Sequence, residues 1–170
     1  GLAAGESIDK MVARVQAATE LNINSAKTLV RTSTNAIANA VREETYHNND
    51  DIIKSVRWVS TLDVRTSSIC QGLDGKTFPV GEGQRPPAHP NCRSTTVPVL
   101  KSWRELGIDK DDLEGGSRIS MDGKVPQNMN YEEWLSRRSK EEQNEAPGKE
   151  KGGLFRKGEL DLKKQTNRFG

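Results

Sequence analysis

The chain has 170 residues, a length that suits one ordinary domain or two small ones. Hydrophobic residues make up 32% and aromatic residues 5%, so we expect a core that is small for the chain length. The net charge of +2 gives little reason for non-specific nucleic-acid binding, and no apolar run approaches the roughly 20 residues that span a bilayer. These features exclude a membrane-spanning chain and disfavour a broadly basic nucleic-acid-binding protein.

Residues 1–50 are predicted to form a helical hairpin. Ser7 is a candidate N-cap, and a first helix over about 7–20 is indicated by apolar residues at helical spacing: Ile8, Met11, Val12 and Val15. Ser25 is the candidate N-cap of a second helix, whose apolar stripe comprises Ala26, Leu29, Val30, Ile37, Ala38 and Val41. The two stripes predict a narrow apolar seam between the helices.

Residues 51–100 are predicted to form a small irregular β module. The β propensity rises over residues 52–59, and Asp74-Gly75 is a turn signal between Ile69 or Leu73 and the segment 77–80. Two consecutive prolines make residues 81–87 a loop, because proline disfavours both helix and central strand. Residues 95–100 are typical of a closing strand. We therefore expect short strands joined by turns.

Residues 101–170 are predicted to form an extended C-terminal arm with a short helix. The helix begins near Asn130 and carries three apolar residues, Tyr131, Trp134 and Leu135. Residues 146–153 are poor in side chains that pack, so we expect the last fifty residues to become ordered only by docking, for example on a partner chain. With the hairpin and the β module, this arm completes an α+β fold.

The two cysteines and a nearby histidine form a candidate metal site. Cys70, His89 and Cys92 have the spacing C-x18-H-x2-C, and thiolate and imidazole groups are normal zinc ligands. Pro90 and Asn91 suit the tight turn that would present His89 and Cys92 to one ion. Asp63 is our candidate for the fourth ligand, with His47 or water as alternatives, whereas Asp74 is expected to serve the Asp-Gly turn.

Two other interpretations of the cysteines remain open at this stage. A disulfide across the 21 intervening residues would contribute roughly 3 kcal/mol, although nothing in the sequence indicates an oxidising compartment. The cysteines are equally compatible with two buried free thiols beside a hydrogen-bonded histidine. An open zinc position also suits catalysis, but the sequence contains no deaminase signature, no G-x-S-x-G elbow and no H-E-x-x-H motif.

Several arginines are candidates for structural roles. Arg31 and Thr32 lie on the predicted second helix, where the guanidinium either holds a carboxylate or lies on a solvated face. Arg65 and Arg93 flank the Cys/His cluster, so we expect internal hydrogen bonds that stabilise loops with little core beneath them. We expect no catalytic residue among them.

The central segment resembles the Mu F-like minor head, or head-morphogenesis, family of tailed phages. The resemblance is carried by Asp63-Val-Arg-Thr, Cys70-Gln-Gly-Leu-Asp-Gly and Pro87-Ala-His-Pro-Asn-Cys-Arg93. It includes Trp58, Thr66, Asp74, Gly75 and Asn91, and extends to segments 3–8, 29–32, 131–135 and 153–158. Cysteine-rich relatives carry further cysteines at the places of Ser67 and Ser94, which implies that the thiolate set is incomplete here.

The resemblance implies a structural function in the virion. Such a protein is expected in few copies inside the capsid, assembled in the host cytoplasm and associated with the portal protein, the major capsid protein or both. We predict no enzymatic activity, zinc as the candidate cofactor, and no membrane partner. One alternative is a virion-carried effector, such as a zinc-dependent hydrolase or toxin-like enzyme. The other is an adaptor ejected with the packaged genome, which would bind DNA through basic residues around Arg137-Arg138 and 149–164.

Overall fold

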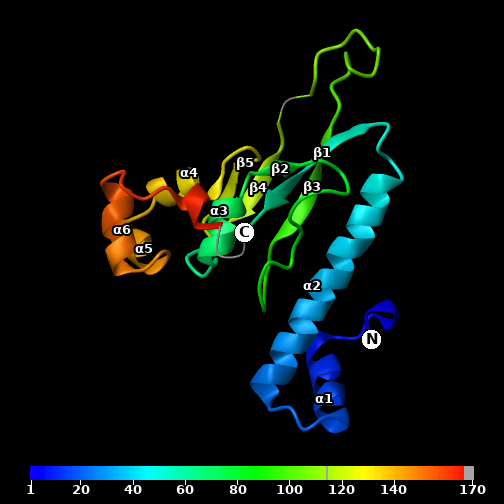
Figure 1. Ribbon diagram of the computed structural model, residues 1–170, viewed down its shortest axis with the longest axis vertical. Coiled ribbons are helices and arrows are strands. Elements are labelled where there is room, and N and C mark those ends of the chain that lie inside the picture. The colour runs from blue at the N-terminus through cyan, green and yellow to red at the C-terminus, as the bar shows by residue number, and fades with distance from the viewer. Residues whose placement is uncertain (114, 167–170) are drawn as a thin grey trace.

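The computed structural model describes residues 1–113 and 115–166. It is 42% helical and 15% strand, which confirms the predicted α+β class and the N-terminal helical hairpin. In Figure 1 a long hairpin projects from a small sheet, and a group of short helices gathers on the other side of that sheet. A short 3-10 helix, η1 (Leu2–Ala4), precedes the hairpin.

The hairpin consists of α1 (Ile8–Ala18) and α2 (Ile23–His47). Ser7 caps α1 by accepting a hydrogen bond from the Lys10 amide, as predicted. The predicted cap of α2 was wrong: Asn22 is the N-cap, and its Oδ1 accepts from the amides of Asn24 and Ser25. Asparagine is as good a cap as serine, and its use here adds almost a full turn to the helix.

The apolar seam of the hairpin covers only the first part of α2. Its buried residues are Met11, Val12, Ala26 and Val30, with Ile8 and Val15 packed against them. The predicted stripe continues to Ile37 and Val41, but these side chains are 52% and 62% exposed. The reason is length, since the 11 residues of α1 cannot cover the 25 residues of α2.

The sheet has three antiparallel strands in the order β2-β1-β3. β1 (Ile53–Val59) lies between β2 (Thr77–Phe78) and β3 (Thr95–Leu100), which confirms the predicted closing strand. Val56 and Trp58 of β1 are fully buried. The C-terminal part of α2 docks beside β3, where the hydroxyl of Tyr46 donates to the carbonyl of Thr96 at 3.0 Å. The hairpin is therefore anchored to the sheet at one end.

A short helix, α3 (Ser68–Leu73), replaces strand structure that we predicted around Ile69 and Leu73. Ser67 caps it by accepting a hydrogen bond from the Cys70 amide at 3.3 Å. Cys70 and Leu73 are buried against Trp58, so local capping and tertiary burial overrode the weak strand signal. The Asp74-Gly75 turn was predicted at the right place, with Gly75 at φ +82°, but it joins a helix to β2 rather than two strands.

The C-terminal residues fold back on the chain rather than projecting from it. A hairpin of β4 (Ser117–Ser120) and β5 (Gly123–Pro126) leads to α4 (Tyr131–Ser136), capped by Asn130 as predicted. Two unpredicted helices follow, α5 (Lys140–Glu145) and α6 (Lys149–Arg156), and then the 3-10 helix η2 (Leu162–Thr166), which packs on α3. The expected docking therefore takes place on this chain's own module.

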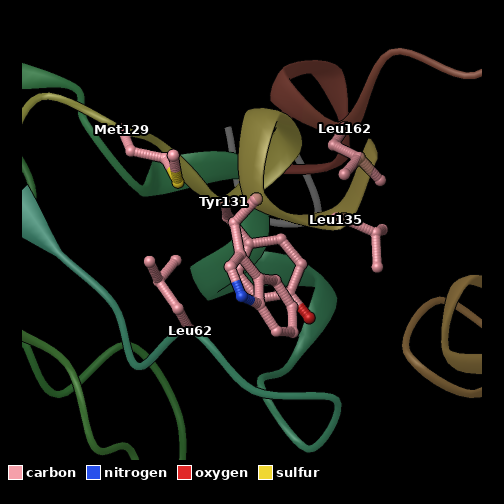
Figure 2. Packing of buried hydrophobic residues seen from close by; sticks show 6 residues of the cluster. Leu62, Met129, Tyr131, Leu135 and Leu162 are labelled. Atoms are coloured by element: carbon pink, nitrogen blue, oxygen red, sulfur yellow. The ribbon is translucent and has the colours of Figure 1, made fainter. Parts of the chain in front are cut away.

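This docking produces the main hydrophobic cluster of the described residues. The cluster contains Leu62, Met129, Tyr131, Trp134, Leu135 and Leu162, each no more than 4% exposed. In Figure 2 the labelled side chains of Leu62 and Met129 approach Tyr131 from one side, and Leu135 and Leu162 lie on the other. The rings of Tyr131 and Trp134 are 5.2 Å apart and tilted by 56°. The few large apolar residues of the C-terminal segment thus converge on one place.

Gly152 explains why residues 146–153 pack despite their composition. A Cβ at this position would lie 2.3 Å from the carbonyl oxygen of Gln143, so only glycine permits the close approach of α6 to α5. The absence of side chains, which suggested a segment that packs poorly, allows direct contact between two helices.

Candidate functional site

Cys70, His89 and Cys92 come together at the junction of α3, the loop before β3 and helix α2. Cys70 is the third residue of helix α3, after the Ser67 cap, and its side chain packs against Trp58. His89 and Cys92 lie on one turn, in which the Cys92 amide donates to the His89 carbonyl at 3.1 Å. The structure therefore brings together the three residues that the C-x18-H-x2-C spacing singled out.

Helix α2 holds the His89–Cys92 turn from the outside. Asn91 adopts a left-handed backbone, with φ +58°, and its amide donates to Thr32 Oγ1 at 3.0 Å. Its side-chain amide donates to Thr28 Oγ1 at 3.0 Å, and Asn35 donates to the Cys92 carbonyl at 2.8 Å. Thr32 therefore helps to hold the turn that carries His89 and Cys92. Arg31 lies on an exposed face of α2.

The three ligand-type atoms form a compact triangle. Cys70 Sγ lies 3.7 Å from Cys92 Sγ and 3.2 Å from His89 Nε2, and all three atoms lie within 4.8 Å of one another. Both cysteines are free thiols and are buried, with exposed fractions of 2% and 4%. His89 Nδ1 lies 2.8 Å from the Pro90 carbonyl. A proton on Nδ1 would satisfy that carbonyl and leave the Nε2 lone pair to accept from the Ser67 hydroxyl, 2.7 Å away, or from the Cys70 thiol, 3.2 Å away.

The two cysteine sulfurs lie within hydrogen-bonding distance, so the thiol of one can donate to the thiolate of the other. The pKa of Cys92 is lowered because the Cys70 thiol donates a hydrogen bond to its thiolate, and neighbouring backbone amides lower it further. The pKa of Cys70 is raised, first because it holds the shared proton and second because it is buried. One negative charge is therefore readily accommodated in the cluster, whereas a second one needs a cation.

Asp63 does not join this triangle, contrary to our expectation for a fourth ligand. Its two carboxylate oxygens accept hydrogen bonds from the guanidinium of Arg93 at 2.6 and 2.7 Å, and Oδ1 also accepts from the Thr66 hydroxyl at 3.1 Å. The Arg93 guanidinium lowers the pKa of this carboxyl, with burial opposing. The bidentate arginine uses the lone pairs that a metal would need. His47, the other alternative, lies against Gly81, on the exposed end of α2.

The loop arginines have different roles. Arg93 makes the internal hydrogen bonds predicted for it, because its fork holds Asp63 beside Thr66. Arg65 differs, since its side chain is 80% exposed and its nearest approach to Asp63 is 3.7 Å. The backbone amide of Arg65, rather than its guanidinium, bonds to Asp63 Oδ1 at 3.1 Å.

Asp74 does more than close a turn. It is fully buried and forms an ion pair with Arg118, which donates to Oδ2 at 2.9 Å and to Oδ1 at 3.0 Å. Its Oδ1 also accepts from the Ser60 amide at 2.6 Å. Burial raises the pKa of the Asp74 carboxyl, and Arg118 opposes that shift.

Arg118 is the residue that sequence reasoning missed. Its guanidinium also donates to the carbonyls of Ser60 and Met129, so it joins the end of β1, the turn after α3 and the approach to α4. It lies in a region of mixed charge without an apolar pattern, and no local signal distinguished it from the solvated arginines nearby. The one clue was Asp74 itself, because a buried carboxylate needs a cationic or hydrogen-bonding partner.

These contacts define a small, tightly held module around Trp58. Its indole nitrogen donates to Ser60 Oγ at 2.9 Å, and Ser60 Oγ donates to the Cys70 carbonyl at 2.7 Å. The motif residues Trp58, Thr66, Asp74, Gly75, Asn91 and Arg93 all lie in or beside this module. Their contacts hold the loops of the module together.

A protein-family model matches the part of the chain that contains this module. The family model described as Phage Mu protein F like protein matches residues 1–97, which covers the hairpin, the Cys/His cluster and most of β3. The chain belongs to this phage Mu F-like family, whose members are phage head-related proteins. No curated protein and no solved structure matched the chain.

None of the helices within residues 1–113 and 115–166 is both long and apolar enough to span a bilayer.

Proposed function

We propose that this chain is a structural minor head protein of a tailed phage, which acts in head morphogenesis by binding the portal protein or the major capsid protein. The observation that carries the proposal is the family match over residues 1–97. The proposed place of action is the capsid interior, reached during assembly in the host cytoplasm.

One exposed face of α2 supports a binding role, and it lies opposite the face from which Asn35, Asn39 and Tyr46 contact β3 and the loop before it. A helix of 25 residues is roughly 37 Å long, and α1 covers only its first part. Ile37 and Val41, four residues apart on one face, expose 52% and 62% of their side chains. Such a face suits helix-to-protein docking, in which apolar residues become buried against another virion component.

The use of the charged residues also supports a structural role. Asp63 and Asp74 are both occupied by arginines of the same chain. In the C-terminal segment, Arg138 pairs with Asp122 and lies 5.5 Å from the ring centroid of Trp134. An arginine used in this way contributes less to a DNA-binding surface than a free one would.

The proposal is tested in a phage that carries this gene. Deletion of the gene should reduce the yield of infectious particles, and complementation in trans should restore it. The chain should be found by mass spectrometry in purified heads and should co-purify with the portal or the major capsid protein. Its absence from purified heads, or a normal yield after deletion, would overturn the proposal.

Substitutions on α2 sharpen this test. The double variant Ile37→Glu/Val41→Glu should keep the melting temperature of the wild type, because both side chains are exposed, but should be incorporated roughly tenfold less. The control is Ile119→Glu on β4, a residue 66% exposed and outside the hairpin, which should be incorporated normally. Equal incorporation of both variants would exclude this face of α2 as the binding surface.

A further inference from the structure

We propose that Cys70, His89 and Cys92 bind one Zn²⁺ ion, with a water molecule beside Ser67 as the fourth ligand. This inference goes beyond a role in head assembly, because a metal site of this kind would stabilise the module in any setting.

Two sides of the triangle are close to those of a zinc site, and the third side, between Cys92 Sγ and His89 Nε2, is at most 4.8 Å. Zinc lies about 2.3 Å from cysteine sulfur and about 2.0–2.1 Å from histidine nitrogen, so a tetrahedral ion places two sulfurs about 3.8 Å apart and sulfur and nitrogen about 3.5 Å apart. The two sulfurs here are 3.7 Å apart, and Cys70 Sγ is 3.2 Å from His89 Nε2. A disulfide requires about 2.05 Å between the sulfurs, which this arrangement does not provide.

The histidine is oriented as a zinc ligand should be. Metal-binding histidines commonly donate their second ring N–H to a carbonyl or carboxylate, which fixes the tautomer and the ring plane. His89 Nδ1 lies 2.8 Å from the Pro90 carbonyl, while Nε2 faces Cys70 Sγ.

The charge of the cluster favours a divalent cation. Two thiolates would neutralise Zn²⁺, which removes the cost of placing a second thiolate beside the first. The neighbouring Arg93 does not oppose the ion strongly, because its guanidinium is paired with Asp63.

A fourth ligand has a place to bind. A small cavity of about 40 Å³ adjoins the cluster and is lined by Thr61, Arg65, Thr66, Ser67, Cys70, His89, Asn91, Arg93 and Ser94. This volume accommodates about one water molecule. Ser67 Oγ lies 2.7 Å from His89 Nε2, and an ion bound to Nε2 would take that lone pair and leave the Ser67 hydroxyl to hydrogen-bond with a water on the ion.

The ligand loop is preorganised without the metal. Thr28, Thr32 and Asn35 of α2 hold the turn through Asn91 and Cys92, and the Ser67 cap holds Cys70. A preorganised site loses little conformational entropy when the ion binds. Zinc would therefore tie α3 to a turn that α2 already supports.

The test uses the full chain, purified under reducing conditions without chelator. Elemental analysis should find one zinc per chain, and Co²⁺ added to the metal-free protein should give the visible and thiolate charge-transfer bands of a tetrahedral Co²⁺–sulfur site. Wild-type protein that takes up neither Zn²⁺ nor Co²⁺ would overturn the proposal. Recovery of a Cys70–Cys92 disulfide under these conditions would overturn it as well.

Two histidine variants form the matched comparison, which avoids cysteine variants that fail to fold. His89→Gln should weaken zinc binding at least tenfold, whereas His47→Gln, at an exposed position outside the cluster, should bind as the wild type does. Equal binding by both variants would place the ion elsewhere and overturn the proposal.

A gain-of-function variant provides a separate readout. Ser67→Cys places a thiol where the fourth ligand is proposed, so it should tighten zinc binding roughly tenfold or more. The new thiolate should also replace the water ligand, which should change the Co²⁺ spectrum. A Ser67→Cys protein with unchanged affinity and an unchanged Co²⁺ spectrum would contradict the proposed position of the fourth ligand.

Discussion

The N-terminal hairpin and the C-terminal segment differ in how they contribute to the hydrophobic core. The hairpin provides four buried residues that pack mainly on one another, namely Met11, Val12, Ala26 and Val30. The segment after β5 provides five of the six buried residues of the main cluster, and Leu62 is the sixth. Yet the hairpin lies within the family match over residues 1–97, and the C-terminal segment lies outside it.

This difference separates the family motif residues from many of the residues that bury apolar surface. The motif residues organise hydrogen bonds and ion pairs around Trp58, whereas much of the apolar cover comes from residues 129–162. Arg118 connects the two sets through Asp74, Ser60 and Met129. We therefore expect the C-terminal segment to be required for stability of the Mu F-like module, and the first part of the hairpin to be more independent of it.

The largest effect is expected at the connection between these regions. Arg118→Met should lower the free energy of unfolding by about 3–5 kcal/mol, because it leaves the buried Asp74 carboxylate without its partner. Urea denaturation provides the measurement. The control Arg65→Met changes a side chain that is 80% exposed and should cost less than about 0.5 kcal/mol. Similar costs for the two variants would show that the connection is not important for stability.

A smaller and more local effect is expected in the hairpin. Val12→Ala removes two methyl groups from a side chain that is 2% exposed and should cost about 1.5 kcal/mol. Hydrogen exchange should show faster exchange of α1 amides and unchanged protection of α4. The control Ile37→Ala, at a 52% exposed position, should change neither. Loss of α4 protection in Val12→Ala would show that the two regions unfold as one unit.

The smallest effect is expected from the ion pair between Asp63 and Arg93. Because the folded-state pKa of Asp63 is lowered from its ordinary value of 3.8, its stabilising contribution is present at neutral pH and is lost as the pH falls below about 4. The Arg93 side chain is 40% exposed, so solvent screening limits the contribution to under about 1 kcal/mol.

Unfolding experiments at pH 7 and pH 3 measure this contribution. Asp63→Asn should reduce the stability difference between the two pH values, and Arg93→Gln should produce the same reduction by removing the cause of the pKa shift. The double variant should show little further change, because each substitution removes the same interaction. An undiminished pH dependence in Asp63→Asn would contradict this assignment.

Local patterns in the sequence identified much of the fold. Ser7 and Asn130 were predicted as caps because a side-chain oxygen near free backbone amides acts within one turn of chain. The strand over 95–100 and the turn at Gly75 follow from equally local preferences. The Cys70, His89 and Cys92 set was recognised by residue type and spacing, although 18 residues separate the first two members.

Other features depended on contacts between distant residues. Helix α3 formed where strand was predicted, because burial of Cys70 and Leu73 against Trp58 outweighed a weak local preference. Asp63 was available as a ligand in the sequence, but the fold placed it beside Arg93 instead of His89.

The sequence by itself determined the hairpin, the starts of α1 and α4 and the residue types of the Cys/His set, because these depend on periodicity, capping and residue type over short distances. Only the tertiary structure decided where the C-terminal segment docks, that Arg118 becomes buried with Asp74, and that Asp63 pairs with Arg93 instead of joining the thiols. Those outcomes depend on burial and charge pairing across 30 or more residues, as with Asp63 and Arg93 or Asp74 and Arg118. No local pattern encodes such a pairing, because each partner alone resembles an ordinary solvated charge.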